Sequence, residues 1–244
     1  MLPDSRDKQA MNLLAVDSAT RTCSVALMQQ GTITAEFGAD LDQTHSRHLM
    51  RLIDAVLELS GQQISELDAL AVTSGPGSFT GLRIGMATVK GFAMAHGLPV
   101  CPVSCLEALA WPYLGVSGLF CAMLDARKKQ VYAQVFGLEQ GRLEEMMPAQ
   151  VAGPDRVIDE ISALGRQPCW FAGSGAVLYS GRIISRLSGS ARLAPGIQNR
   201  IRAAVVAEMA GEMLGSGAVR DAAGVVPHYI RQSDAERKKK SPGK

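Results

Sequence analysis

A glycine-rich stretch between residues 72 and 97 constrains the fold of this chain more than any other feature. A β-branched run over 70–73 leads into Ser-Gly-Pro-Gly-Ser at 74–78, and a helical pattern then starts at Ser78 or Thr80, both good helix N-caps. A strand, a glycine loop and a helix N-terminus together expose backbone N–H groups at the positive end of a helix dipole, which suits an anion. The alternative is that the glycines only bring strand and helix close together, since the pattern is neither the P-loop nor the dinucleotide fingerprint.

The helix that follows the loop, over 81–97, is apolar on nearly all its faces. Its only charged residues are Arg83 and Lys90, and small residues recur at every fourth position around Gly91. Each glycine costs about 1 kcal/mol inside a helix, so this spacing needs a packing reason, such as the close approach of another helix. The helix predicted at 45–59 also carries more apolar surface than one sheet face covers. We therefore expect a partner interface formed by Leu49, Leu52, Ile53, Val56, Ile84, Gly85, Thr88 and Gly91.

The composition is that of an ordinary globular protein. Hydrophobic residues make up 47% of the chain and charged residues 20%, and the formal net charge of +2 does not indicate a protein that binds nucleic acid by itself. The five cysteines form no Cys-x-x-Cys pair, which indicates buried, reduced thiols. Residues 1–10 lack the apolar core of a signal peptide, and the uncharged stretch 108–124 is interrupted by Pro112. We expect a cytoplasmic protein without a membrane span, in which 108–124 is a loop that enters a buried strand.

The order of the predicted elements indicates an α/β fold made of two similar units. Each unit has the order β-β-β-α-β-α, with a short strand at 12–16 opening the first and another at 119–124 opening the second. In the second unit we expect a helix at 179–187 and a long helix at 197–214. The predicted domains are an extension at 1–10, an N-terminal lobe with the partner-binding helices at 11–103, a C-terminal lobe at 104–231 and a basic, disordered tail at 232–244.

Two carboxylates stand at equivalent strand ends, Asp17 in the first unit and Asp125 in the second. In a two-lobed nucleotide-binding fold such a pair would hold Mg²⁺ and orient a water. The residues after Asp125, however, are Ala-Arg-Lys-Lys, which include no glycine that would let a phosphate approach the backbone. The sequence therefore leaves nucleotide binding open, with the candidate phosphate residues Asp17, Ser18, Ser74, Gly75, Gly77 and Ser78.

Other motifs for chemistry are weak. His45 and His48 are three residues apart at a helix start, which is compatible with a metal, but no third ligand is evident. Ser78 lies in Gly-Ser-Phe-Thr-Gly, whose spacing differs from that of a nucleophile elbow. We predict no catalytic residue and no metal site in this chain.

Four stretches resemble the TsaB (YeaZ) family: 13–26, the helix start at 45–49, Ser-Gly-Pro-Gly-Ser-Phe-Thr-Gly-Leu-Arg-Ile-Gly at 74–85, and Pro-His-Tyr-Ile-Arg at 227–231. The long glycine motif is the most specific of them. The resemblance implies an actin-like (ASKHA), ribonuclease-H-like fold with two lobes. It also implies a role in making threonylcarbamoyladenosine beside the anticodon of tRNAs that read A-starting codons.

The resemblance further implies a non-catalytic subunit. Its expected partners are a TsaD-type catalytic paralogue, which pairs through helices of the first lobe, a TsaE-type ATPase, and tRNA through the complex; the isolated chain is expected to form a homodimer. It implies no cofactor required by this chain, although weak binding of ATP or ADP at the complex interface stays open. Two alternatives also stay open, a peptidase-like protein and a stand-alone ATPase of the actin-like fold, although no nucleophile and base set supports the first.

Overall fold

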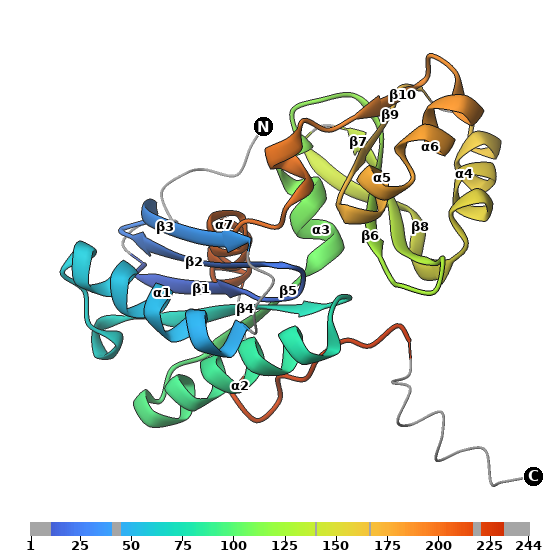
Figure 1. Cartoon of the computed structure of the whole chain (residues 1–244). Coiled ribbons are helices and arrows are strands. Elements are labelled where there is room, and N and C mark those ends of the chain that lie inside the picture. The colour runs from blue at the N-terminus through green and yellow to red at the C-terminus, as the bar shows by residue number, and fades with distance from the viewer. Residues whose placement is uncertain (1–10, 41–44, 140, 166, 217–220, 232–244) are drawn as a thin grey trace, which may run out of the picture.

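Two five-stranded sheets with the same strand order form the framework of the protein (Figure 1). The structure is a computed structural model that describes residues 11–40, 45–139, 141–165, 167–216 and 221–231. The extension predicted at 1–10 and the tail predicted at 232–244 lie outside these ranges. Within the described ranges, no helix has the length and apolarity that crossing a bilayer demands.

The first sheet has the order β3-β2-β1-β4-β5. Strand β2 is antiparallel to β1 and β3, whereas β4 is parallel to both β1 and β5. Parallel neighbours need crossover connections, which α1 and α2 supply. The elements are β1 (Leu13–Asp17), β2 (Thr22–Gln29), β3 (Thr32–Asp40), α1 (His45–Ser60), the short helix η1 (Ile64–Glu66), β4 (Ala69–Gly75), α2 (Phe79–His96) and β5 (Val100–Ser104).

The second sheet repeats this arrangement with the order β10-β9-β6-β7-β8. A meander again comes first, and β9 pairs parallel to both β6 and β10. The predicted duplication of a β-β-β-α-β-α unit is therefore confirmed. The elements are β6 (Gly118–Asp125), β7 (Val131–Glu139), β8 (Arg142–Ala152), α4 (Pro154–Ala163), β9 (Cys169–Ala172), α5 (Ser174–Leu178), α6 (Ser180–Leu187) and β10 (Ala191–Leu193).

Helices cover both faces of the first sheet. Helices α1 and α2 pack on the face that presents Leu14 and Val16, while α7 (Ala203–Gly215) packs on the opposite face, which presents Leu13 and Ala15 (Figure 1). Helix α7 lies within the range predicted as the C-terminal lobe, yet it contacts β1, β2, β4 and β5. The last helix of the described chain thus completes the core of the first sheet.

The N-terminus of α7 is bound by side chains of the first sheet. The Ser24 hydroxyl accepts a hydrogen bond from the Ala203 N–H (3.1 Å), and the Glu36 carboxylate accepts one from the Ala204 N–H (3.0 Å). Glu36 also pairs with the guanidinium of Arg202. A carboxylate at a helix N-terminus satisfies unpaired N–H groups and complements the helix dipole. These contacts fix α7 to the first sheet.

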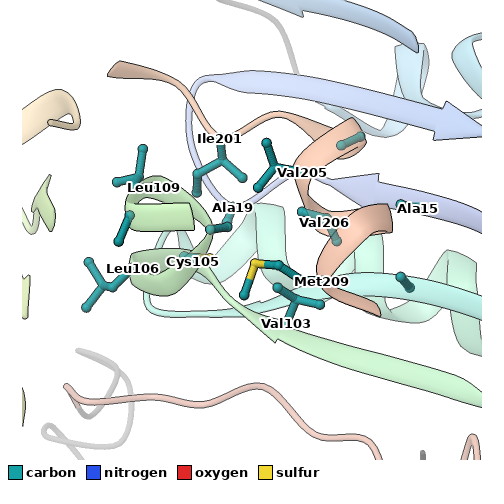
Figure 2. Packing of buried hydrophobic residues seen from close by; sticks show 14 of the residues in the cluster. Ala15, Ala19, Val103, Cys105, Leu106, Leu109, Ile201, Val205, Val206 and Met209 are labelled. Atoms are coloured by element: carbon teal, nitrogen blue, oxygen red, sulfur yellow. The ribbon is translucent and has the colours of Figure 1, made fainter. Parts of the chain in front are cut away.

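Helix α3 (Cys105–Ala110) connects the two sheets, followed by a short helix η2 (Trp111–Tyr113). It contacts β4 and β5 of the first sheet and β6 of the second. Figure 2 shows its Leu106 and Leu109 in one buried cluster with Ile201 and with Val205 of α7. The prediction of a loop at the start of 108–124 is therefore wrong, because small and apolar residues there form a buried helix.

One predicted helix in the second half is confirmed, and another differs from the structure. The helix predicted at 179–187 is α6, which begins at Ser180; a separate short helix, α5, precedes it and ends before Tyr179, whose backbone is not helical (φ −109°, ψ 18°). The helix predicted at 197–214 begins only at Ala203, after a 3-10 turn, η3 (Gly196–Asn199). Arg200 and Arg202 are extended because they reach Asp40 and Glu36 on strand β3.

Candidate functional site

The glycine loop packs directly against the end of strand β1. The N–H of Ser78 donates to the carbonyl of Ala19 (2.7 Å), and the Ser78 hydroxyl caps α2 by accepting from the Gly81 N–H (3.2 Å). A Cβ added at Gly77 would lie 2.4 Å from the Ala19 oxygen, and one added at Gly85 would lie 2.4 Å from the Ser18 hydroxyl. Only glycine allows the first turns of α2 to lie this close to β1.

The last described segment, 221–231, closes the other side of the loop; we call it the C-terminal strap. The His228 N–H donates to the Ser74 carbonyl (2.7 Å), and a Cβ at Gly75 would lie 2.5 Å from the His228 oxygen. Gly75 also has φ +122°, a value that L side chains rarely adopt. The ring of Tyr229 stacks on that of Phe79, with 4.7 Å between centroids.

The strap also joins the two halves of the chain. The Lys90 ammonium of α2 donates to the Val225 carbonyl (3.1 Å), and Val225 is buried in the core of the first sheet. At the other end of the strap, the Arg231 guanidinium donates to the Ala126 carbonyl (2.9 Å) in the turn between β6 and β7. The 227–231 motif therefore connects helix α2 to the second sheet.

These contacts show that the glycine loop is closely packed, and phosphate binding there stays a prediction. Ser18, Gly75 and Asp17 are buried, and the Ser74 hydroxyl donates to the Val103 carbonyl (3.1 Å). The protein's own backbone, from Ala19 on one side and His228 on the other, occupies the space beside the glycines. Of the six candidate phosphate residues, Gly77 and Ser78 line the cavity that lies between the two sheets.

That cavity, of about 640 Å³, lies between the turns of the two sheets. The first sheet contributes the β1–β2 turn with Arg21, and the second contributes the β6–β7 turn with Asp125. Further walls come from α5, η3 and the end of the strap. A volume of this size is typical of small-molecule sites. It is lined by Ala19, Thr20, Arg21, Thr22, Asp40, Gly77, Ser78, Phe79, Leu124, Asp125, Ala126, Arg127, Lys128, Tyr132, Ser174, Val177, Gly196, Asn199, Arg200 and Arg231.

Asp17 is fully buried beneath this cavity wall. Its Oδ1 accepts hydrogen bonds from the Ala19 N–H (3.1 Å) and the Thr73 hydroxyl (2.8 Å), whereas its Oδ2 has no partner among the described residues. Burial raises the pKa of the Asp17 carboxyl from 3.8 to about 7, against the opposing effect of the two hydrogen bonds. Asp17 thus keeps its proton over much of the acidic range.

The two strand-end carboxylates do not share one environment. Asp125 lines the cavity, and its Oδ1 accepts from the Arg127 N–H (2.9 Å), but Asp17 is not among the described lining residues. The two carboxylates that would hold Mg²⁺ in a nucleotide-binding fold therefore do not line this cavity together. No group of three or more His, Cys, Asp or Glu side chains in the described ranges could hold a metal. For the histidine pair, the side chain of His45 lies outside the described residues, and His48 has a buried Nε2 without a partner there.

The eight predicted interface residues divide into two groups. Leu49, Ile53 and Val56 are fully buried against the first sheet, and Gly85 is buried against Ser18, so these four serve the core of the single chain. A charge at Ile53 would therefore test folding rather than pairing. The other four are accessible, with Leu52, Ile84 and Thr88 partly buried and Gly91 exposed.

Sequence reasoning missed several residues of this region. The exposed large apolar side chains of α1 and α2 are Met50 (41%), Leu59 (73%) and Met94 (76%). The sequence does not mark Arg21 as a cavity cation, and it gives the 227–231 motif no physical role. The strap contacts residues far away in the sequence, so no local pattern could have indicated it.

Comparison with known proteins gives concordant results. A family model described as TsaD, tRNA N6-adenosine threonylcarbamoyltransferase, matches residues 39–238. The tRNA threonylcarbamoyladenosine biosynthesis protein TsaB of Bacillus subtilis is 30% identical over 228 residues, which cover 93% of this chain and 97% of the relative. The solved structure of YeaZ from Pseudomonas aeruginosa superposes with a TM-score of 0.77 at 31% identity, over 90% of this chain and 99% of that one.

A more distant likeness concerns the fold alone. Component A of the (R)-2-hydroxyglutaryl-CoA dehydratase of Acidaminococcus fermentans matches with a TM-score of 0.50 at 13% identity, over 85% of this chain and all of that one. Together with the two sheets of identical strand order, these likenesses confirm the predicted actin-like fold.

The packing role of the glycine loop predicts opposite effects for two Gly→Ala substitutions. Gly77→Ala should lower the free energy of unfolding by about 1–3 kcal/mol, because its methyl group meets the Ala19 carbonyl. Gly91→Ala should raise it by about 0.4–1 kcal/mol, because a Cβ there meets nothing within 4 Å. Urea denaturation measures both. Equal stabilities of Gly77→Ala and the unsubstituted protein would contradict the close contact.

The buried Asp17 predicts a pH dependence of stability. An unfolded aspartate releases its proton near pH 3.8, whereas the folded protein holds it to about pH 7. The unfolding free energy contributed by this group is therefore full below pH 3.8 and falls as the pH rises to 7. Relative to Asp17→Asn, the unsubstituted protein should lose about 4 kcal/mol between pH 4 and pH 8. Urea melts of both proteins across this range provide the measurement, and parallel pH profiles would refute it.

Proposed function

The chain belongs to the TsaB family of tRNA threonylcarbamoyladenosine biosynthesis proteins, and from this membership we propose that it is a non-catalytic scaffold subunit. In this proposal it acts in the cytoplasm and holds a TsaD-type catalytic paralogue in its working conformation, with a TsaE-type ATPase joining the pair. The assembly then transfers a threonylcarbamoyl group to the adenosine beside the anticodon in tRNAs that read A-starting codons.

The observation that most supports a scaffold role is the filled glycine loop. In the fold's first half, the strand–glycine–helix junction is the place where backbone N–H groups would meet a phosphate. Here the Ser78 N–H is bonded to Ala19, and His228 covers the opposite side at Gly75. The junction is thus used to hold β1, α2 and the C-terminal strap together.

The outer surface of α1 and α2 supports the pairing role. Both helices lie on one face of the first sheet, so their exposed sides point away from it (Figure 1). We define the outer helix face by the exposed residues Met50, Ala87, Gly91, Met94 and Ala95. It combines two flexible apolar side chains with small residues that let a second helix approach closely. The same face would serve a homodimer in isolation and the seam with the paralogue in the complex.

Gly91 allows this seam to be tested without disturbing the fold. Nothing lies within 4 Å of a Cβ at Gly91, so Gly91→Gln should fit the single chain and stabilise the helix by up to about 1 kcal/mol. At a close helix contact, the added side chain should weaken association at least about tenfold, the equivalent of 1.4 kcal/mol. Sedimentation of the full chain alone, and mixed with its purified TsaD-type partner, measures both associations.

Gly181→Gln on α6 is the matched control, because a Cβ at Gly181 also meets nothing within 4 Å. It should change stability like Gly91→Gln and leave association unchanged. Retained pairing in Gly91→Gln would place the seam elsewhere.

The function itself predicts the result of removing the protein from its cell. Threonylcarbamoyladenosine should disappear from tRNA, because the catalytic partner would lose its scaffold. Nucleoside mass spectrometry of total tRNA measures the loss. Gly181→Gln should rescue the modification and Gly91→Gln should rescue it poorly. Unchanged modified adenosine after depletion would overturn the function, and full rescue by a variant proven unable to pair would overturn the scaffold mechanism.

A further inference from the structure

The cavity between the two sheets concentrates positive charge. Five cationic side chains line it together with only two carboxylates, those of Asp40 and Asp125, so the lining has a formal excess of three positive charges. The whole chain has a net charge of only +2. We call the five cations the cationic rim; they are Arg21, Arg127, Lys128, Arg200 and Arg231.

The cations of the rim come from four separate segments, and contacts with neighbouring groups hold several of them in place. Asp40, at the end of strand β3, pairs with Arg200 (2.9 Å) and with Arg21 (3.4 Å), so one carboxylate orients two guanidinium groups. Arg231 of the strap donates to the Ala126 carbonyl (2.9 Å), which fixes it beside the β6–β7 turn. Cations from distant parts of the chain therefore line the same cavity.

The β6–β7 turn has an unusual backbone. Arg127, Lys128 and Lys129 all have left-handed φ values, of 60°, 53° and 58°. The turn is closed by hydrogen bonds between Ala126 N–H and the Gln130 carbonyl and between Gln130 N–H and the Arg127 carbonyl, both 3.0 Å. Left-handed conformation disfavours every residue except glycine and, to a lesser degree, asparagine and aspartate. Three successive long cationic residues here reduce stability, and strain of this kind is typical of functional positions.

We propose that the cationic rim binds the phosphates of an RNA strand, which under the proposed function is the substrate tRNA. The rim guanidinium groups are accessible, with exposed side-chain fractions of 84% for Arg127, 67% for Arg21 and 50% for Arg200. Their spread over four segments suits an extended polyanion. A free nucleotide is the less favoured occupant, because the backbone beside Gly75 and Gly77 is already covered by the protein's own atoms.

The strained turn makes it possible to separate binding from folding. In the double variant Arg127→Gly/Lys128→Gly, glycine relieves the left-handed strain, so the melting temperature should be unchanged or raised. The same variant removes two cations that would each neutralise a phosphate. The affinity of the full chain for an unmodified tRNA transcript should fall about five- to eightfold for each of these cations at 0.1 M salt. The slope of log K against log salt should become shallower by about 1 for each phosphate that the variant leaves without its cation.

Two control variants match the two effects. Gln30→Gly removes another exposed left-handed residue, at φ 51° in the β2–β3 turn, without changing charge. Arg156→Ala removes a guanidinium from α4, where it pairs with Glu160 outside the cavity. Both should bind the transcript as the unsubstituted protein does, in fluorescence anisotropy titrations over a range of salt.

Each result decides the proposal. A loss of affinity with a shallower salt slope, in the double variant alone, supports it. Unchanged affinity, or an equal loss in Arg156→Ala, overturns it. Calorimetric titration with ATP and with pyrophosphate tests the other sources of phosphate. If the double variant no longer binds these two ligands but still binds RNA, the RNA assignment is overturned. This proposal rests on the proposed function, but RNA binding is measured on the purified chain. A negative binding result is therefore distinguishable from a negative result of the depletion test.

Discussion

The close contact between the glycine loop and its two backbone neighbours is the constraint on which the rest of the structure depends. On one side the Ala19 carbonyl accepts from Ser78, and on the other the His228 N–H donates to Ser74. Side chains at Gly75 or Gly77 would overlap these neighbours. The contact sets the position of α2 on the first sheet, and it fixes the strap that leads Arg231 to the second sheet.

Helix α7 is positioned by the need to cover the second face of the first sheet. The face of the first sheet opposite α1 and α2 presents small and apolar residues, such as Ala15, Ala26 and Ala71, which need a covering helix. Helix α7 provides it, with its N-terminal N–H groups bound by Ser24 and Glu36. The chain thus returns from the second sheet to the first in α7, and the strap then leads from the first sheet back to the β6–β7 turn of the second. These two passages, with α3, connect the two sheets.

The sequence predicted what depends on local patterns. Apolar runs located the strands, and the small residues with Ser78 located α2 and its cap, which the structure confirms. Apolar content could not separate core from interface, because both need the same side chains: Ile53 is in the core and Met94 is on the surface. Arg200 and Arg202 fit a helical pattern, yet ion pairs with strand β3 hold them extended. Contacts of this kind join distant residues and leave no periodic signal.

The two halves share one packing device and differ in the turns that face the cavity. In the second half, Gly173 and Gly175 lie at the end of strand β9 as Gly75 and Gly77 lie at the end of β4. Side chains at Gly173 and Gly175 would overlap the Met123 carbonyl near the end of β6. Both junctions therefore use glycine to seat a helix start against the neighbouring strand. The first turn, in contrast, contributes one cation, Arg21, and the second contributes Arg127 and Lys128 in strained conformations. Close packing accounts for the framework that the two halves share, whereas the turns that face the cavity differ in charge and in backbone conformation.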